Sequence, residues 1–329
     1  MAIDLGTANS IVLVLGKGVV ITEPTVVALD EETSKVLAVG NSAKEMLGKT
    51  PEGVLACRPL RDGVIADYAV TESLLKYLIN KALGGARLFK PEVMVSVPSG
   101  VTSVESRAVL DACYFAGARS AHLIPEPLAA AIGAGLPVSE PSGNMVVNIG
   151  GGTSEVAIIS LYGIVSQGSV RVAGNKIDEV IIQHLRRKFG LIIGEKTAED
   201  VKISIGSAFP LENDPIFEVR GRDFVSGLPR TVPVTSAEIC HAIQGPLSQI
   251  VSAIRSVLEQ TPPELASDIV DRGFVLSGGT SQLRNLDSYL SQAISVPVHV
   301  ADDPIFCVVK GIAAILENSH LYSKSMTKT

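Results

Sequence analysis

Two glycine-containing turns are the segments of this sequence best suited to binding a charged ligand. They span residues 4–7 and 148–153, and each stands between two apolar runs that are typical of strands. Glycine lets the backbone turn sharply and approach a ligand closely, so the N–H groups of such a turn can point at a phosphate. A single glycine turn between strands more often serves only to reverse the chain than to bind an anion. Two turns of one pattern, each led by Asp or Asn, favour a phosphate-binding site.

Two carboxylates accompany these turns. Asp4 ends an apolar strand, where a buried carboxylate is costly without a cation or hydrogen-bond donors. Mg²⁺ held through water molecules would satisfy it; capping of the turn is the alternative. Glu126 stands between two prolines at the start of an Ala-rich helix. It could position or deprotonate the water that attacks a γ-phosphate, or it could cap the helix N-terminus.

A third glycine pair lies between an apolar strand and a helix start, in residues 276–286. Gly278 and Gly279 would let a flat nucleobase or a ribose lie against the backbone. The same pattern also describes an ordinary strand-to-helix turn. Taken together, the three glycine segments and the two carboxylates predict that the chain binds ATP with Mg²⁺ in a cleft between two related α/β lobes.

The elements that would position these residues alternate between strand and helix, which predicts a parallel sheet covered by helices. In the first half, a strand meander is expected over residues 11–15, 19–21 and 25–29, and a buried strand over 93–97. The helices expected there run from the N-cap Thr71 to residue 83, from a capping box at 102–105 to residue 116, and over 125–135.

The opening pattern returns after residues 137–143, whose prolines and glycine indicate a hinge or linker. AIDLGTANSIVLV (residues 2–14) and VVNIGGGTSEVAII (residues 146–159) share a strand, an Asp or Asn, a glycine turn and a second strand, which indicates an internal duplication. Further helices are expected over 178–189, 198–206, 237–258, 281–293 and 305–316, with a small polar sheet over 217–234 and a buried strand over 273–277.

The composition narrows the class of protein. A chain of 329 residues that is 46% hydrophobic and 19% charged is expected to be globular, with more than one core. A net charge of −6 disfavours nucleic acid as a partner. The four cysteines lie far apart without metal-ligand spacing, which favours inert thiols in a reducing cytoplasm. No segment resembles a membrane-spanning helix or a signal peptide, and binding to a membrane surface stays open.

Four segments carry a family resemblance: IDLGTAN, IPEPLAAAIG, NIGGGTSEV and LSGGTSQLRNL have the order and spacing of the actin, Hsp70 and sugar-kinase superfamily. Within it the chain resembles MreB, the bacterial actin, through KGVVITEPTVVAL, PLRDGVIADY, LFKPEVMVSVP, EPSGNMVV, AEDVKISIG and TPPELASDI. The resemblance implies an α/β actin-like ATPase fold of two duplicated RNase H-like lobes, each with a small subdomain. The implied subdomains are IA (1–27, 61–140 and 310–329), IB (28–60), IIA (141–176 and 241–309) and IIB (177–240).

The resemblance also implies a function. It predicts a cytoplasmic ATPase that polymerises with itself into paired protofilaments on the inner face of the cell membrane. Such filaments guide cell-wall synthesis in rod-shaped bacteria, with membrane proteins of cell shape and cell-wall synthesis as partners. ATP and Mg²⁺ are the implied cofactors.

Site residues follow from the matching positions. Glu126 is implied to act in hydrolysis with Thr153 beside it, and Asp4 to hold the metal ion. The implied nucleotide contacts are the first phosphate loop (Asp4, Gly6, Thr7, Ala8 and Asn9), the second (Gly150, Gly151, Gly152 and Thr153), the purine and ribose contacts Glu199 and Lys202, Asp178 near the cleft, and the adenosine motif Gly278, Gly279 and Thr280.

Three departures from the family pattern matter. Asn148 stands where the family has Asp, which predicts slow or absent hydrolysis with binding retained. Thr280 replaces a third glycine of the adenosine motif. The chain begins three residues before Asp4 without an amphipathic helix, so membrane attachment is expected to rest on Leu88 and Phe89, two large apolar residues in a loop.

Two other functions fit these residues less well than a filament protein does. A small-molecule kinase needs a general base facing an acceptor hydroxyl, and no spare Asp stands in a suitable glycine turn. A chaperone ATPase would need a substrate-binding domain beyond the nucleotide fold, for which the chain leaves no room. A copolymer or regulatory filament subunit with little hydrolysis remains as the alternative, because of Asn148.

Overall fold

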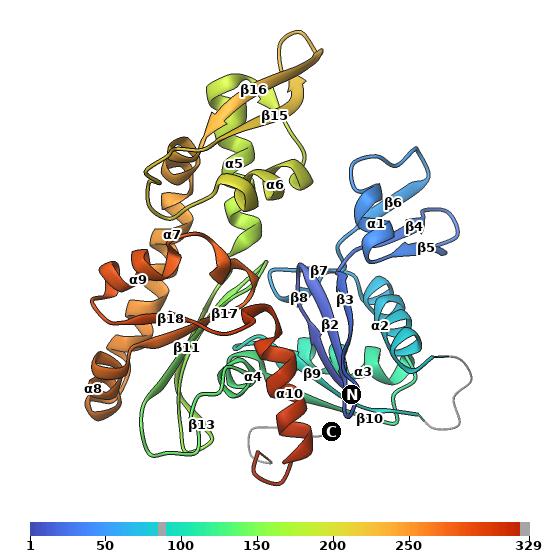
Figure 1. The fold of residues 1–329 in the computed structure, drawn as a ribbon. Coiled ribbons are helices and arrows are strands. Elements are labelled where there is room, and N and C mark those ends of the chain that lie inside the picture. Colours follow the sequence, from blue (N-terminus) through green and yellow to red (C-terminus); the bar gives the residue numbers. More distant parts are fainter. Residues whose placement is uncertain (85–89, 323–329) are drawn as a thin grey trace.

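The computed structural model of the chain describes residues 1–84 and 90–322. Two lobes stand side by side, each built on a five-stranded sheet, and each carries a smaller sheet at the same end of the molecule (Figure 1). We call the first lobe I and the second lobe II. Residues 88 and 89, predicted to contact the membrane, lie outside the described residues.

The sheet of lobe I mixes antiparallel and parallel pairs, in the order β10-β9-β1-β2-β3. The strands β1, β2 and β3 form an antiparallel meander, and β9 and β10 add to β1 in parallel. The five strands are β1 (Ala2–Leu5), β2 (Asn9–Val14), β3 (Gly18–Pro24), β9 (Glu92–Val97) and β10 (Ser120–Pro125).

Lobe II repeats this topology. Its order is β13-β12-β11-β17-β18, in which β11, β12 and β13 form the meander and β17 and β18 the parallel addition. The strands are β11 (Asn144–Ile149), β12 (Ser154–Ser160), β13 (Gly163–Val170), β17 (Phe274–Ser277) and β18 (Val298–Val300). The internal duplication and the α/β fold class predicted from the sequence are confirmed.

The predicted third strand of the first meander was assigned to the wrong sheet. β4 (Val27–Asp30) pairs with β5 (Val36–Val39) and β6 (Val54–Cys57), next to the short helix α1 (Asn41–Met46). Strand β3 ends at a proline, which lacks the N–H needed to continue a ladder. In lobe II the small sheet is formed by β14 (Leu191–Ile192), β15 (Ile216–Asp223) and β16 (Pro229–Thr235). The polar pattern over residues 217–234 predicted β15 and β16 but not β14.

Two helices fill the space between the large sheets. α4 (Glu126–Gly133) and α10 (Cys307–Glu317) share one core with the facing sides of both sheets. A Cβ atom at Gly133 would collide with the carbonyl of Cys307, and one at Gly311 with the carbonyl of Ala129. The two helix backbones therefore touch through glycine, and this contact holds the lobes together at their base.

The outer faces of the sheets are covered separately. α2 (Tyr68–Leu83) and α3 (Ser103–Phe115) pack on lobe I. On lobe II the core includes residues of α5 (Gly174–Phe189), α6 (Glu195–Ile205), α7 (Ser236–Glu259), α8 (Pro263–Arg272) and α9 (Leu286–Ile294).

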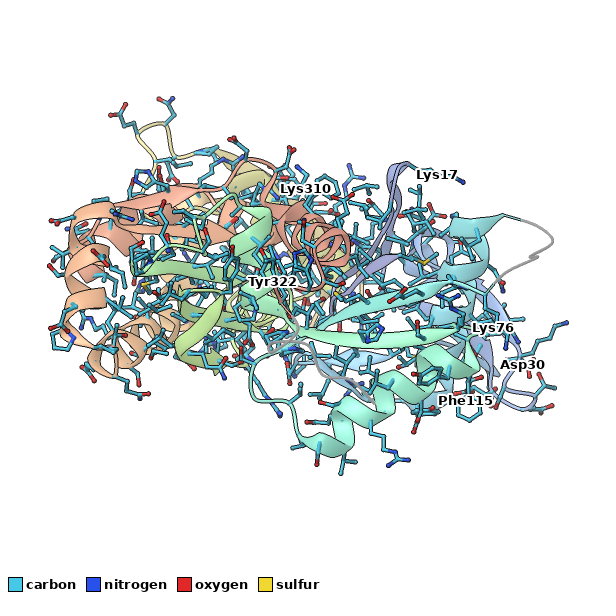
Figure 2. The ribbon with its side chains drawn as sticks, turned by 90° about the horizontal axis from the view of Figure 1, so that it is seen from below. Lys17, Asp30, Lys76, Phe115, Lys310 and Tyr322 are labelled. Carbon is cyan, nitrogen blue, oxygen red and sulfur yellow. The ribbon has the colours of Figure 1, made fainter. Side chains whose placement is uncertain are left out.

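Seen from below, Phe115 lies on the outer edge of lobe I, whereas Tyr322 lies between the lobes (Figure 2). Its ring meets that of Tyr162 edge-on, 5.4 Å between centroids.

Several helix ends differ from the sequence prediction. α2 is capped by Asp67, one turn before the predicted cap, and Thr71 lies inside the helix. The capping box of Thr102 and Glu105 is confirmed. The helix expected over residues 281–293 is split into a 3₁₀ turn (Gly279–Gln282) and α9, because Asn285 adopts a left-handed conformation with φ 59° that no α-helix can include.

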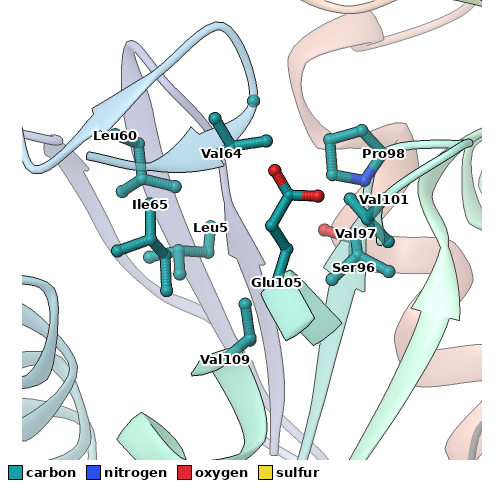
Figure 3. A pocket seen from close by; sticks show the side chains of 11 residues that line it. Leu5, Leu60, Val64, Ile65, Ser96, Val97, Pro98, Val101, Glu105 and Val109 are labelled. Carbon is teal, nitrogen blue, oxygen red and sulfur yellow. The ribbon is translucent and has the colours of Figure 1, made fainter. Parts of the chain in front are cut away.

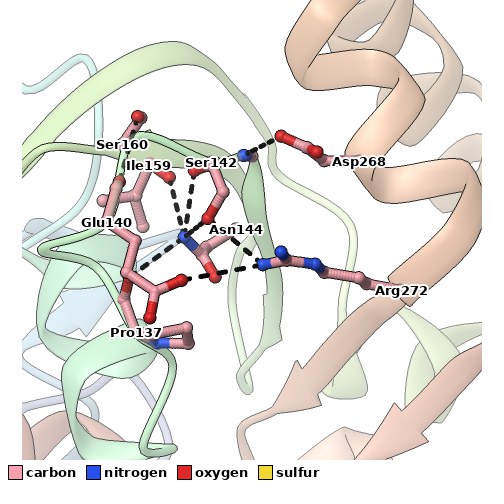
Figure 4. A network of polar contacts seen from close by, with 9 residues as sticks. Pro137, Glu140, Ser142, Asn144, Ile159, Ser160, Asp268 and Arg272 are labelled. Atoms are coloured by element: carbon pink, nitrogen blue, oxygen red, sulfur yellow. Dashed lines mark hydrogen bonds and ion pairs between the residues drawn. The ribbon is translucent and has the colours of Figure 1, made fainter.

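The predicted linker of residues 137–143 is anchored rather than loose (Figure 4). The side chain of Asn144 donates hydrogen bonds to backbone carbonyls on both sides of the linker, including that of Pro137 at 3.3 Å. From α8, Asp268 accepts a 2.7 Å bond from the N–H of Gly143 and Arg272 donates to Ser142. The connection between the lobes is thereby fixed to lobe II.

Candidate functional site

The two glycine turns meet at the junction of the lobes. The first joins β1 to β2 and the second joins β11 to β12. A Cβ atom added to Gly151 would lie 2.5 Å from the Cβ of Ala8, and one added to Gly152 would lie 2.7 Å from Oγ1 of Thr7. Only glycine lets the backbone of the second turn approach Thr7 and Ala8 this closely. The two turns, far apart in the sequence, therefore form one site.

Threonine side chains fix the conformation of the first turn. Thr25 donates from Oγ1 to the carbonyl of Gly6 at 2.7 Å, and its N–H donates to the carbonyl of Ala8 at 2.9 Å. Thr7 accepts a 3.0 Å hydrogen bond from the N–H of Gly63. Two carbonyl oxygens of the turn are thus directed at Thr25. Asn9, at the start of β2, is exposed.

Residues 62 and 63 add a third turn that sequence reasoning missed. They join the short strands β7 (Leu60–Arg61) and β8 (Val64–Ile65). A Cβ atom at Gly63 would lie 2.7 Å from Pro98 and 3.0 Å from the methyl group of Thr153. The sequence signal was present, because Asp-Gly between short apolar runs favours a tight hairpin.

Asp4 lies at the end of β1, beneath the first turn. Its Oδ1 accepts a 3.1 Å hydrogen bond from Ser96, and burial raises the pKa of Asp4 to about 7. Among the described residues no cationic side chain pairs with Asp4, and no cluster of three or more potential metal ligands occurs. A nearly buried carboxylate with one hydroxyl donor fits a metal ion held mainly by water and by the phosphates of a ligand.

Glu126 and Asn148 connect the lobes beside Asp4. The amide of Asn148 donates to Oε1 of Glu126 at 2.6 Å, while Oδ1 of Asn148 is buried without a hydrogen-bond partner in the described structure. Burial raises the pKa of Glu126 well above its ordinary value, and the charges of Asp4 and Glu155 raise it further. The bond from Asn148 acts in the opposite direction by favouring the ionised carboxylate.

Glu155 is a second buried carboxyl group that sequence reasoning missed. It lies opposite Asn148 in the β11–β12 pair, so both side chains project from the same face of the sheet. Its Oε2 accepts a 2.9 Å hydrogen bond from the N–H of Ser99 in lobe I, and its Oε1 accepts one from Ser169. Its complete burial raises its pKa. A charged residue inside an apolar strand, in NIGGGTSEV, was the available signal.

The second glycine turn is held by lobe II itself. Its carbonyl at Gly150 accepts from Oγ1 of Thr280 at 2.7 Å and from the N–H of Gly174 at 3.2 Å. The hydroxyl of Thr280 gives a structural reason for the departure from a third glycine. Gly278, with φ +86°, has no room for a side chain, because a Cβ atom would collide with the carbonyl of Ile149.

Asp178 and Lys202 form an ion pair close to this turn. Nζ of Lys202 donates to Oδ2 of Asp178 at 2.9 Å and to the carbonyl of Gly174 at 3.2 Å. Burial raises the pKa of Asp178 to about 6 against the effect of Lys202. Glu199 lies one turn before Lys202 on α6, and its carboxylate binds Lys44 of lobe I at 2.6 Å.

An apolar hollow lies behind the first turn, in lobe I (Figure 3). Leu5, Val64, Pro98 and other apolar side chains line it. The carboxylate of Glu105 points toward it but is bound by the N–H and hydroxyl of Thr102 in the capping box. The hollow is therefore not a site for a polyphosphate.

No helix in the described part of the chain has the length and hydrophobicity to cross a bilayer.

A family model described as MreB/Mbl protein matches residues 1–324. The cell shape-determining protein MreB of Escherichia coli (strain K12) is 51% identical over 322 residues, which cover 96% of this chain and 93% of the relative. The cell shape-determining protein Mbl of Bacillus cereus (strain ATCC 10987 / NRS 248) is 48% identical over 318 residues, covering 97% and 96%.

A solved structure agrees with the sequence match. MreB5 of Spiroplasma citri, bound to AMPPNP, superposes with a TM-score of 0.93 at 37% identity and covers 98% of this chain and 97% of its own. The actin-like fold predicted from the sequence is therefore present. Sequence, family model and fold agree over nearly the full length: the chain belongs to the MreB/Mbl family.

Proposed function

We propose that this protein is an ATP-binding, actin-like cytoskeletal subunit that polymerises and takes part in determining rod cell shape. The observation that carries the proposal is the contact of two glycine turns, one from each lobe, next to the partly buried carboxyl groups of Asp4 and Glu126. Opposed turns of this kind can grip a polyphosphate from two sides. The nucleotide-bound structure of a 37% identical relative supports the same ligand class.

Each predicted site residue has a proposed role in this cleft. Residues 6–9 and 150–153 bind phosphates, residues 278–280 face the adenosine, and Asp178, Glu199 and Lys202 form the wall on α5 and α6. Asp4 would hold Mg²⁺ through water. When bound, the metal ion neutralises phosphate charge as it develops in the reaction.

Glu126 is the proposed base for hydrolysis, with Thr153 beside it. Burial and the charges of Asp4 and Glu155 raise its pKa, so its carboxylate is a stronger base than that of an exposed glutamate. Asn148 orients the Glu126 carboxylate through the 2.6 Å hydrogen bond. That bond also occupies one carboxylate oxygen, which is consistent with slow hydrolysis.

The proposed filament and its location in the cell are inferred from the relatives of this chain. Proteins named as cell shape-determining are about half identical to this chain over almost its whole length. We propose self-association into paired protofilaments at the cytoplasmic face of the cell membrane, where membrane proteins of cell-wall synthesis are the partners.

One experiment tests the main proposal. The purified protein is mixed with Mg-ATP and anionic liposomes, imaged by negative-stain electron microscopy, and assayed for phosphate release in the same sample. Filaments on lipid with little phosphate release are expected. Brisk release would mean that Glu126 and Thr153 suffice without a carboxylate at position 148. Absence of filaments under every nucleotide would reject the homopolymer.

A second candidate is a copolymer subunit that binds ATP and hydrolyses it poorly. The observation that favours it is the amide of Asn148 in place of a carboxylate at the bond to Glu126. Glu126→Ala is then expected to change phosphate release little. A further hundredfold drop in that variant would reject this candidate, because it would show that Glu126 is already active.

Membrane binding is proposed through Leu88 and Phe89. Leu88→Ser combined with Phe89→Ser is expected to abolish sedimentation with liposomes while ATP binding stays intact. Phe115→Ser is a matched control, since that ring is 68% exposed on α3 and lies outside the proposed anchor. Unchanged sedimentation of the double variant would rule out the anchor.

A further inference from the structure

One face of α6 is directed toward lobe I and the second glycine turn. Glu195, Glu199 and Lys202 are spaced at i, i+4 and i+7, so they lie on the same side of the helix. Lys202 is directed toward the second glycine turn through Asp178 and the carbonyl of Gly174. The other two side chains extend to lobe I.

Two ion pairs join this face to lobe I. Nζ of Lys44, on α1, lies 2.6 Å from Oε2 of Glu199, and Nε of Arg58, just after β6, lies 3.7 Å from Oε2 of Glu195. Both cations belong to the small sheet region of lobe I, and both acids to α6 of lobe II. Figure 1 shows α1 and α6 on the facing sides of the two lobes.

The Lys44–Glu199 pair is the more enclosed of the two. Its side chains are 27% and 30% exposed, whereas Glu195 is 69% exposed. Burial acts to raise the pKa of Glu199, but the hydrogen bond and charge of Lys44 and the charges of Lys202 and Arg58 outweigh it and hold the pKa below its ordinary value. Glu199 is therefore an ionised acceptor at neutral pH, held by cations from both lobes.

An ionised carboxylate has about four lone-pair positions, and Lys44 contacts only Oε2 of Glu199. Enough acceptor capacity remains for a pair of vicinal hydroxyl groups such as those of a ribose. A glutamate side chain that is already held in place loses less conformational entropy when a ligand binds to it. Lys44 of lobe I therefore holds the Glu199 carboxylate in a fixed position, in which it can accept hydrogen bonds from the ligand.

We propose that Lys44 is a positioning residue for ribose recognition: by holding Glu199 from the opposite lobe, it makes discrimination between ribose and 2′-deoxyribose nucleotides depend on the two lobes standing together. The inference rests on the proposed binding of ATP in the cleft. Arg58 and Glu195 support the same arrangement.

The test compares the dissociation constants of ATP and 2′-deoxy-ATP, with Mg²⁺, by isothermal titration calorimetry on the full chain. Lys44→Ala is expected to weaken ATP binding about two- to fivefold, the range for a partly exposed ion pair. It is expected to leave 2′-deoxy-ATP almost unchanged, so that the ratio of the two constants falls toward one. Lys44→Arg is expected to restore the ratio, because it retains a cation at the same place.

The matched control is Lys176→Ala. Lys176 also lies in a short ion pair, 2.7 Å from Glu179, but both residues are on α5 and do not join the lobes. This variant is expected to keep the wild-type ratio.

Three outcomes would overturn the proposal. A wild-type ratio in Lys44→Ala with intact ATP binding would show that Lys44 has no part in ribose recognition, and the proposed function would stand. Equal weakening of both nucleotides would assign Lys44 to closure of the lobes alone. No binding of either nucleotide by the wild-type protein would remove the proposed function, and this inference with it.

Discussion

The hydrogen bond between Asn148 and Glu126 gives the sharpest prediction. In Asn148→Asp, the amide that donates to Oε1 of Glu126 at 2.6 Å is replaced by an acceptor. Two carboxyl groups at this distance cannot both be ionised, so they must share a proton. At pH 8 the pair must either bind a proton from solvent or separate. Separation loses a hydrogen bond to a charged group, which is worth about 1.5–3 kcal/mol, and we expect a loss of this size in the free energy of unfolding at pH 8, without nucleotide.

The sign of the pH dependence follows from the shared proton. Burial and nearby charges already raise the pKa of Glu126, and a second carboxyl group raises the pKa of the pair further. A raised pKa in the folded state costs stability only above the pKa of the unfolded chain, near pH 4. The loss of unfolding free energy in Asn148→Asp is therefore expected to be small near pH 4, because there the protonated carboxyl donates a hydrogen bond in place of the amide. This loss is expected to grow as pH rises.

Urea unfolding followed by circular dichroism at pH 5 and pH 8 measures this deficit, and phosphate release with Mg-ATP measures the catalytic consequence. Introducing the carboxylate that the family resemblance implies at position 148 is expected to raise phosphate release at least about tenfold, since one catalytic group typically contributes ~10² to 10⁴. Asn144→Asp is the matched control, because Asn144 is buried on the same strand and, within the described residues, its side chain donates to the linker of residues 137–143 and to the carbonyl of Ile159. It should destabilise the protein and leave phosphate release unchanged.

A variant that is as stable as the wild type at pH 8 would refute the reasoning on the carboxyl pair. Unchanged phosphate release in a folded Asn148→Asp protein would refute the assignment of slow hydrolysis to the amide.

Three further predictions concern the same cleft. Asp4→Asn is expected to stabilise the nucleotide-free protein at pH 8 by up to roughly 4 kcal/mol, given a pKa raised to about 7, and the gain should disappear as pH falls toward 4 in thermal unfolding. Gly152→Ala is expected to cost about 1–3 kcal/mol and weaken nucleotide binding, because its Cβ would lie 2.7 Å from the first turn. Glu155→Gln is expected to shift the acid limb of the phosphate-release profile to lower pH, because it removes a charge that raises the pKa of Glu126.

A different result would contradict each of these three predictions. A pH-independent gain in Asp4→Asn would mean that the carboxylate is not the source of instability. Gly150→Ala is the control for the glycine turn, since its Cβ would meet its nearest neighbour only at 3.5 Å, and equal effects of both variants would contradict the steric argument. An unshifted profile in Glu155→Gln would remove its influence on Glu126.

Local patterns in the sequence were enough to predict much of the fold. The glycine turns, the capping box of α3 and the duplicated strand–turn–strand pattern depend on neighbouring residues, so spacing alone identifies them. Asp4 and Glu126 were identified for the same reason, because each is a charge inside an apolar segment. The third strand of the first meander was misplaced, since a strand pattern does not state which sheet the strand joins.

Only the tertiary structure brought distant residues together. The bond from Asn148 to Glu126, the burial of Glu155 against Ser99 and the pairing of Lys44 with Glu199 all cross from one lobe to the other. Their distances depend on how the two sheets pack around α4 and α10, a contact that glycine makes possible in the middle of the molecule. The sequence therefore determined which groups the chain offers to a nucleotide, and the packing of the lobes decided which of them act on one another.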